Sequence, residues 1–357
     1  MWEEVAACQA ADGNTLLAVS ASTKPDKENY IKTDIDMAAF AIYTYKFRDV
    51  ENVGGLFLGI PDEDMTPLVS LQDKQNFVQS IFKDDLDGKR PFECARTEEQ
   101  KNADGKKTHN RTKYGCKVVW EKSGLALLMV SNPYAKITRH QKFQKIKEQD
   151  EPWCHVLIDN RYGREFMAIE KNTAFNSPDT VASILESSFR ARLAPHKVVM
   201  DIKNQYEPDA FWDVVEQYRP FGISEVSFKF AAPNHPWSTE LIGAISDAAR
   251  SMKARPTTIF SSPDGDPIEL NKEDEQLSKY VQVCAMEGED ILVKVKGIRS
   301  RIHIIDAKDK YVFKQMSDET FRCILSADPE LFDENFEALA AFLNQIRTSK
   351  EAKEAEE

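Results

Sequence analysis

Residues 116–130, CKVVWEKSGLALLMV, contain the clearest structural signal in the chain. Two apolar runs, residues 116–120 and residues 125–130, flank the polar turn EKSG, which ends in glycine. Apolar runs of this length joined by such a turn are typical of a β-hairpin. Pro133 follows soon after, and a proline disfavours further pairing because it lacks the amide hydrogen that a strand ladder needs. The hairpin therefore predicts a β-rich N-terminal part of the protein.

The same part of the chain contains further predicted elements. Residues 37–47 alternate along two faces and predict a strand, and residues 15–19 predict another. Asp73 is expected to cap a helix, because a carboxylate accepts hydrogen bonds from the free amide groups of a first turn. The polar stretch 95–114 has the composition of a loop. Together these elements predict a β-rich domain over residues 1–150.

Residues 151–325 predict a second domain in which strands and helices alternate. A hairpin of residues 154–170 comes first, and strands at residues 198–202, 225–230 and 257–260 are separated by amphipathic helices. This alternation favours a mixed or parallel sheet with right-handed crossovers. A ferredoxin-like sandwich and an RNase H-like sandwich both fit this order of elements.

Residues 326–357 are a separate element in the sequence. Their apolar side chains recur at spacings of four and three, which predicts an amphipathic helix. The stripe consists of Phe332, Phe336, Leu339, Leu343 and Ile346. Such a helix either docks on its own domain or forms a seam with a partner helix. The predicted fold class is therefore α+β, with a β-rich N-terminal domain that contains a basic hairpin or loop, a mixed α/β sandwich, and a C-terminal amphipathic helix.

The composition of the 357-residue chain limits the classes of protein to which it can belong. Hydrophobic residues make up 41% of the sequence, which is enough for buried cores and excludes a chain disordered throughout. No apolar run is long enough to span a bilayer and the first residues lack a secretory signal, so no membrane partner is expected. The six cysteines are scattered without a CxxC pair, which predicts reduced thiols in the cytoplasm. P-loop, dinucleotide-binding and α/β-hydrolase motifs are absent, and no cofactor is predicted.

Charge is distributed unevenly along the sequence. Residues 101–147 contain twelve lysines and arginines but only two acids, Asp104 and Glu121, so this segment carries +10. The whole chain carries −12, and the remainder therefore sums to −22. A cationic segment in an acidic protein indicates a polyanionic partner, and Tyr114 and Trp120 are close enough in sequence to stack on bases. The candidate nucleic-acid-binding residues are Lys106, Lys107, Arg111, Lys113, Lys117, Lys136, Arg139, Lys142 and Lys145.

Local structure and alternative roles are also predicted for this segment. Residues 106–113 are expected in the loop, and residues 137–147 are expected to form a surface helix on which Lys142 and Lys145 share a face. Two other interpretations remain open. The segment can be a solvated surface balanced by acids elsewhere, or it can bind an acidic protein or a second copy of the chain. A protein partner or a homo-oligomer is therefore expected beside nucleic acid.

A second candidate site is catalytic. Asp179 follows a proline, and Asp201 and Lys203 come next in the order of a PD-(D/E)xK nuclease. In that chemistry two carboxylates hold Mg²⁺ and the lysine activates the attacking water. Asp179 also begins a predicted helix, where an acid is expected for capping and for its interaction with the helix dipole. The nuclease needs both acids to meet across adjacent strands, so the fold decides between these interpretations.

Five short stretches within residues 152–234 carry a resemblance to a known family. They are residues 156–161 (VLIDNR), 168–170 (AIE), 174–175 (AF), 211–212 (FW) and 228–234 (FKFAAPN). In these stretches the chain resembles an uncharacterised bacterial family found among mobile-element and phage-defence genes. The resemblance implies an anti-phage or abortive-infection context and assigns no catalytic residue.

The function expected from the sequence is a non-catalytic, cytoplasmic component of phage defence. It contacts nucleic acid or a partner through residues 101–147. One alternative is the Mg²⁺-dependent nuclease of Asp179, Asp201 and Lys203. The other is a subunit that oligomerises through its C-terminal helix.

Overall fold

The computed structural model describes residues 38–50, 67–101, 107–141, 144–230, 256–262, 266–306, 311–325, 336, 338–344 and 346. These residues form both helices and strands, which confirms the α+β class. Every strand pairing among them is antiparallel, so the expected mixed or parallel sheet is wrong. The order of elements does not fix strand direction, because the partners of a strand can come from distant parts of the chain. The strand expected at residues 15–19 lies outside the described residues.

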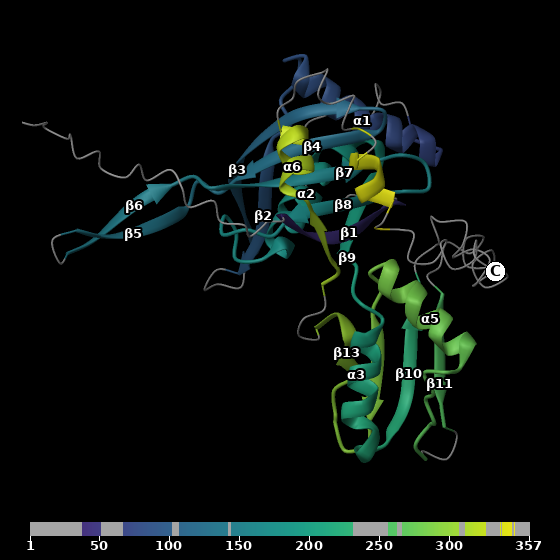
Figure 1. The fold of residues 1–357 in the computed structure, drawn as a ribbon. Helices are drawn as coiled ribbons and strands as arrows, with labels where there is room; N and C mark the ends of the chain where they lie inside the picture. The colour runs from purple at the N-terminus through teal and green to yellow at the C-terminus, as the bar shows by residue number, and fades with distance from the viewer. Residues whose placement is uncertain are drawn as a thin grey trace, which may run out of the picture. The chain divides into compact units, whose positions relative to one another are not determined.

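The described strands form an eight-stranded sheet as the largest unit (Figure 1). Across this sheet the order is β14 (Phe313–Met316), β1 (Ala38–Asp49), β8 (Phe166–Glu170), β7 (Trp153–Asp159), β4 (Leu125–Ser131), β3 (Lys107–Lys122) and β2 (Cys94–Lys101), and β9 (Val198–Asn204) also pairs with β1. The pairs β4–β7 and β1–β8 join strands from the two sides of residue 150. The domain boundary expected at residue 150 therefore does not separate two sheets.

The hairpin predicted at residues 116–130 is formed by β3 and β4, and its turn is tighter than the four residues expected. Lys122 pairs with Leu125, and the two residues between them, Ser123 and Gly124, have φ values of 51° and 83°. Positive φ at both positions is the geometry of a two-residue hairpin turn. A Cβ at position 124 would lie 2.7 Å from Cγ of Arg161, so this position requires glycine.

The polar stretch 95–114 is not the loop that its composition predicts. It forms most of β2 and the first part of β3, which pair continuously from Cys94 with Tyr114 to Lys101 with Lys107. Backbone hydrogen bonds hold a two-stranded ladder, so it does not require the apolar alternation on which the prediction depended. Residues 102–106 at the tip lie outside the described residues.

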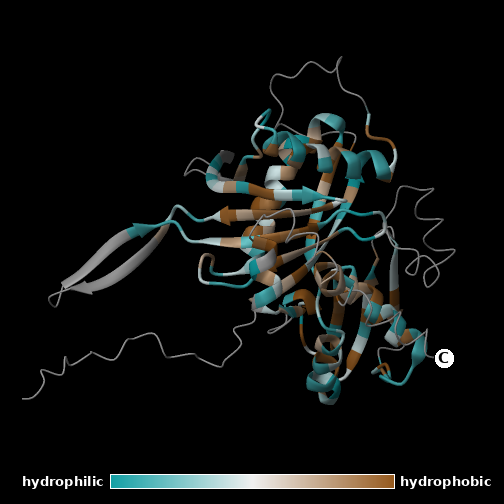
Figure 2. Cartoon of the chain, turned by 45° about the horizontal axis from the view of Figure 1, so that its top comes forward, coloured by the Kyte–Doolittle hydropathy of each residue, from teal (hydrophilic) through white to brown (hydrophobic). Residues whose placement is uncertain are grey.

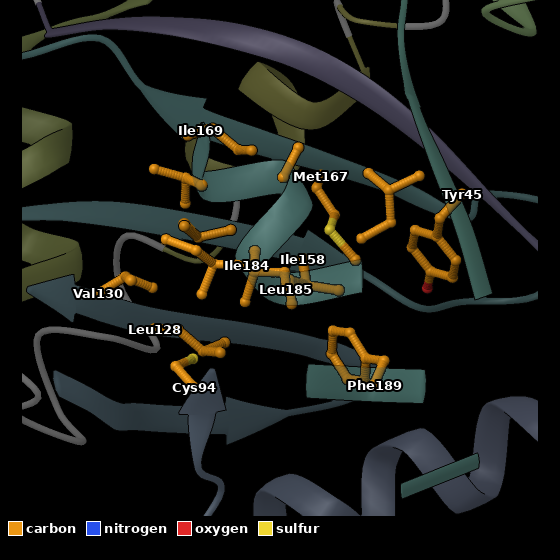
Figure 3. Close-up of a cluster of buried hydrophobic side chains, with 14 of the residues drawn as sticks. Tyr45, Cys94, Leu128, Val130, Ile158, Met167, Ile169, Ile184, Leu185 and Phe189 are labelled. Atoms are coloured by element: carbon orange, nitrogen blue, oxygen red, sulfur yellow. The ribbon is translucent and has the colours of Figure 1, made fainter. Parts of the chain in front are cut away.

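Helices α1 (Leu71–Leu86) and α2 (Pro178–Leu193) cover one face of the large sheet. Figure 3 shows Ile184 and Phe189 of α2 among the strand side chains of this core, which include Leu128 of β4. All three side chains are fully buried. Burying each side chain of this size stabilises the fold by roughly 1.5–3 kcal/mol.

Capping residues fix where these helices begin. Ser70 is the N-cap of α1 and accepts a hydrogen bond from the amide of Asp73, whose carboxylate accepts one from the amide of Ser70. This is a capping box, so the expectation that Asp73 itself is the N-cap is wrong. Ser177 caps α2 by accepting from the amide of Asp179, and Pro178 occupies the first helical position.

Helix α6 (Asp318–Leu325) and the helical residues 338–344 cover the opposite face of the large sheet. Hydrophobic residues, brown in Figure 2, gather on the strands between the two helical layers. The described members of the predicted C-terminal stripe pack here, namely Phe336, Leu339, Leu343 and Ile346. Phe332 lies outside the described residues. These four described residues of the stripe therefore pack against the chain's own sheet.

A second sheet is built around its own core. Its strand order is β11 (Thr257–Ser261), β10 (Ile223–Lys229), β12 (Ile291–Val295) and β13 (Ile302–His303). Helices α3 (Asp209–Tyr218) and α5 (Glu275–Met286) pack with these strands around buried residues that include Phe211 and Val281. Short 3-10 turns are formed by Ala194–His196, Arg219–Phe221 and Ile304–Asp306.

Strands β5 (Ala135–Gln141) and β6 (Gln144–Asp150) form a two-stranded ribbon (Figure 1). Among the described strands they pair only with each other. The surface helix predicted over residues 137–147 is therefore wrong. Cations three residues apart fit a helix, but the alternation of Lys145, Ile146 and Lys147 fits the two-residue period of a strand.

Candidate nucleic-acid interface

Strand β3 presents predicted cations on a single face. Side chains alternate along a strand, and the pairing of β3 is unbroken from residue 107 to residue 118. The predicted residues with described side chains that share this face are Arg111, Lys113 and Lys117, and all three are exposed. Lys107 lies in the same strand and pairs with Lys101 of β2. Tyr114, on the other face of β3, packs against the core under α1 and α2.

The acid Glu93 lies among these cations. Its carboxylate is 3.5 Å from the guanidinium of Arg111 and 3.5 Å from the ammonium of Lys113. All three side chains are more than half exposed, so solvent screens the attraction and the pairs add little to folding stability. One carboxylate shared by two cations leaves a positive balance, and Lys117 has no ion pair with any described residue. This face of β3 is therefore cationic.

The β5–β6 ribbon holds several of the predicted cations in one paired unit. Lys136 of β5 pairs with Gln149, and Lys145 of β6 pairs with His140. Arg139 of β5 pairs with Ile146. The pairing therefore brings Lys136, Arg139 and Lys145 into one short ribbon.

Two of the predicted cations cannot be placed in β3 or in the ribbon. Lys106 and Lys142 lie outside the described residues. The register could not be read from the sequence, because it depends on where the turn between the two strands falls.

The predicted catalytic residue Asp179 is occupied by hydrogen bonds. It lies in the first turn of α2, and its carboxylate accepts from the hydroxyl of Tyr43 at 2.7 Å and from the hydroxyl of Tyr311. Burial and the adjacent Asp179 carboxylate raise the pKa of Tyr43 far above its ordinary value, so this hydroxyl stays a donor. A carboxylate bound by two hydroxyls has the geometry of a structural acceptor.

The other two predicted catalytic residues are held by oppositely charged side chains. Asp201 accepts two hydrogen bonds from Arg48, at 2.9 and 3.0 Å, and the ammonium of Lys203 is 2.6 Å from the carboxylate of Glu289. In the described part of the chain, no group of three or more His, Cys, Asp and Glu side chains could hold a metal ion. The arrangement required by the nuclease motif is therefore not found among the described residues.

Asp179 and Lys203 nevertheless line one cavity of about 560 Å³. Asp290 and His303 also line it, and the Nδ1 atom of His303 is 2.6 Å from a carboxylate oxygen of Asp290. A carboxylate bound at Nδ1 orients the ring and leaves the other nitrogen for proton transfer. Burial raises the pKa of Glu186, which lines the same cavity. This arrangement is chemically suited to acid–base chemistry.

Two buried or half-buried charge pairs near this cavity were not predicted from the sequence, because no short motif marks them. Asp290 and His303 lie on either side of β12, and Lys46 reaches the carboxylate of Glu287 at 2.6 Å. The acidic run at residues 287–290 is the one local signal, because several acids at the end of a helix require compensating partners.

A scan against protein-family models and searches of the curated proteins and of the solved structures find no match for this chain. None of the helices in the described residues has the length and apolar character needed to cross a bilayer. The described cysteines Cys94, Cys116, Cys154 and Cys284 are free thiols.

Proposed function

We propose that the protein binds nucleic acid through the basic face of β3 and the β5–β6 ribbon. The main support is the register of β3, which gathers Arg111, Lys113 and Lys117 on one face of one strand. A strand rises about 3.3 Å per residue, so Arg111 and Lys113 are separated by roughly 7 Å, and Lys113 and Lys117 by roughly 13 Å. Cations in such a row can contact separate phosphates of one backbone.

Electrostatics supports the same proposal. Each phosphate that a lysine or arginine neutralises releases condensed counterions, and this release drives binding at low salt. The net charge of −12 repels nucleic acid from most of the surface, so binding is confined to the cationic faces. Such contacts position the polyanion without reading its sequence.

Fluorescence anisotropy with a labelled 20-nucleotide strand tests the proposal. The full chain with Lys107, Arg111, Lys113 and Lys117 changed to Glu is expected to lose binding at 50 mM salt. A matched control variant carries the same change at exposed Lys272, Lys294, Lys296 and Arg299 of the second sheet region. Equal losses in the two variants, or undiminished binding by the β3 variant, would contradict the proposal.

A Mg²⁺-dependent nuclease is a second candidate, supported by the cavity that Asp179 and Lys203 share. Incubation of labelled DNA and RNA with the protein in Mg²⁺ or Mn²⁺ tests it. The candidate requires cleavage by the wild type that is lost in Asp201→Ala. Intact substrate, or equal cleavage by Asp201→Ala, removes it.

The setting in phage defence is part of the proposal and is supported by the resemblance of residues 152–234. Phage plating on bacteria that express the chain tests it. Protection is expected to disappear in the β3 variant and to persist in the control variant. Equal plating with and without the wild-type chain would contradict a role in defence.

A further inference from the structure

Trp153 is an exposed aromatic side chain beside the cationic face of β3. It is 51% exposed, and no ring contact with a described residue is found for it. Cross-strand pairing runs from Gly115 of β3 to Ser131 of β4 and from Ser131 to Trp153 of β7. Directly paired residues share a face, so Trp153 lies on the same face of the sheet as the β3 cations. Lys113 and Lys117 lie two residues to either side of Gly115.

Helix α6 covers this face at His155, which lies two positions further along β7. The ring of His155 packs on Phe321 of α6 at 5.0 Å, and His155 is buried. Trp153, at the next position of the same face, is half exposed. The backbone of Trp153 is held in place, because Trp153 pairs with Ser131 of β4 and its carbonyl accepts a hydrogen bond from the side chain of Asn172. The indole is thus carried by a fixed strand and remains open to solvent.

The backbone between Trp153 and the lysines carries the small residues Gly115 and Ser131, and the carboxylate of Glu151 lies beside them. Two interstrand spacings, roughly 10 Å, separate Trp153 from Gly115. Glu151 is exposed and accepts a hydrogen bond of 2.7 Å from the hydroxyl of Ser131, and its carboxylate oxygen lies 3.0 Å from the place of a Cβ at position 115. A flat ring that lies against Trp153 therefore has to pass this acid before its phosphate reaches Lys113 or Lys117.

We propose that Trp153 stacks on an unpaired base, so that the nucleic acid bound on this face is single-stranded. This inference rests on the proposed function and adds the class of nucleic acid. An aromatic ring stacks on any base, and such stacking is sequence-tolerant. In a duplex the base faces are already stacked on their neighbours, so Trp153 gains nothing without unstacking them. Single strands are therefore preferred over duplexes of the same length.

Anisotropy titrations of the full chain with a labelled 20-nucleotide oligothymidine and with the matching duplex test this inference. Trp153→Ala is expected to weaken single-strand binding roughly 5- to 150-fold and to leave duplex binding unchanged. Trp153→Phe keeps a stacking ring and retains most of the affinity. The control is Tyr162→Ala, which removes a 70% exposed aromatic after the far end of β7 and leaves binding unchanged.

The outcomes separate the inference from the proposed function. If Trp153→Ala binds the single strand as tightly as the wild type while the β3 charge variant loses binding, stacking is wrong and the cationic face stands. Equal losses for single strand and duplex also overturn stacking, because a base face is then not the contact. If the wild type binds neither probe, both proposals fail. Thermal unfolding of Trp153→Ala is expected to match the wild type, since the ring is half exposed.

Discussion

The hydroxyl of Tyr43 donates a hydrogen bond of 2.7 Å to the carboxylate of Asp179, across 136 positions of sequence. It ties β1 of the large sheet to the first turn of α2. The hydroxyl of Tyr311 donates to the other carboxylate oxygen. Asp179 therefore stabilises the contact between a helix and a strand, which is a sufficient reason for an acid at this position.

Removal of this acceptor is expected to destabilise the fold. Asp179→Ala removes an acceptor that the hydroxyls of Tyr43 and Tyr311 share, and we expect a loss of about 1–3 kcal/mol in the free energy of unfolding. Tyr43→Phe removes one donor and is expected to cost less. Urea titrations followed by circular dichroism measure both. Unchanged stability of Asp179→Ala, with loss of an Mg²⁺-dependent activity, would instead favour the catalytic role.

The buried ion pair of Lys46 provides a second test. Burial lowers the pKa of Lys46, but Glu287 and Glu289 outweigh burial and hold it above its ordinary value. The side chains of Lys46 and Glu287 are nearly inaccessible. Lys46→Met removes the cation from its buried pair with Glu287, whereas Glu289 keeps its ion pair with Lys203, and the change is expected to cost about 3–5 kcal/mol.

The control for this change is Lys272→Met, which removes an exposed lysine that is 2.7 Å from Asp209. Exposed pairs contribute about 0–1 kcal/mol. Urea midpoints compare the two variants. Equal midpoints would show that the Lys46 pair does not contribute more than a surface pair.

The acid sensitivity of the fold is expected to depend on Glu170. Burial raises the pKa of Glu170, but hydrogen bonds from the ring and the amide of His155 outweigh burial and hold the pKa below its ordinary value of about 4.5. A carboxylate whose pKa is lower in the folded state contributes stability above its unfolded pKa. That contribution disappears as the pH falls from about 4.5 through the folded value. Glu170→Gln is therefore expected to flatten the loss of stability below pH 4.5, measured by urea titrations between pH 3 and pH 7. Identical pH profiles would contradict this role.

Glu93 is expected to weaken nucleic-acid binding. Its carboxylate is within 3.5 Å of both Arg111 and Lys113 and competes with phosphate for them. Glu93→Gln removes this competition and is expected to tighten binding several-fold at 50 mM salt, with little change in stability. Anisotropy titrations measure the change. Weaker binding by Glu93→Gln would show that the acid positions the cations and does not oppose the ligand.

The part of the ribbon in the interface is tested by reversing the charge of two of its lysines. Lys145→Glu with Lys147→Glu changes β6, whereas the control, Lys294→Glu with Lys296→Glu, changes two exposed lysines of the second sheet region. We expect the first variant to reduce affinity and to lower the slope of log affinity against log salt by about 0.7–0.9 per lost contact. The second variant is expected to keep the wild-type slope. Equal slopes for the two variants would remove the ribbon from the interface.

The elements that could be predicted from sequence are those fixed by local signals. The β3–β4 hairpin has apolar runs on both sides of a glycine turn, and α2 has Ser177 and Pro178 at its start. Both signals lie within a few residues of the elements they define. The distal part of the β2–β3 pair has no such signal, because its ladder is polar on both strands.

The candidate interface could be predicted in its residues but not in its shape. The excess of lysines over residues 101–147 identified the cations, but only pairing decides which of them share a face. Lys113 shares a face of β3 with Arg111 and Lys117, whereas the neighbouring Tyr114 lies on the other face and packs against the core. Trp153 lies outside that segment in sequence and joins the face of β3 through the intervening strand β4.

The most direct test of the central claim is to map where a bound strand touches the protein. A single-stranded oligonucleotide with photoreactive bases is cross-linked to the full chain, and the modified peptides are identified by mass spectrometry. We predict cross-links in residues 107–117, in residues 136–147 and at Trp153. Cross-links confined to the second sheet, or to the cavity that contains His303, would contradict the claim that the face of β3 is the interface.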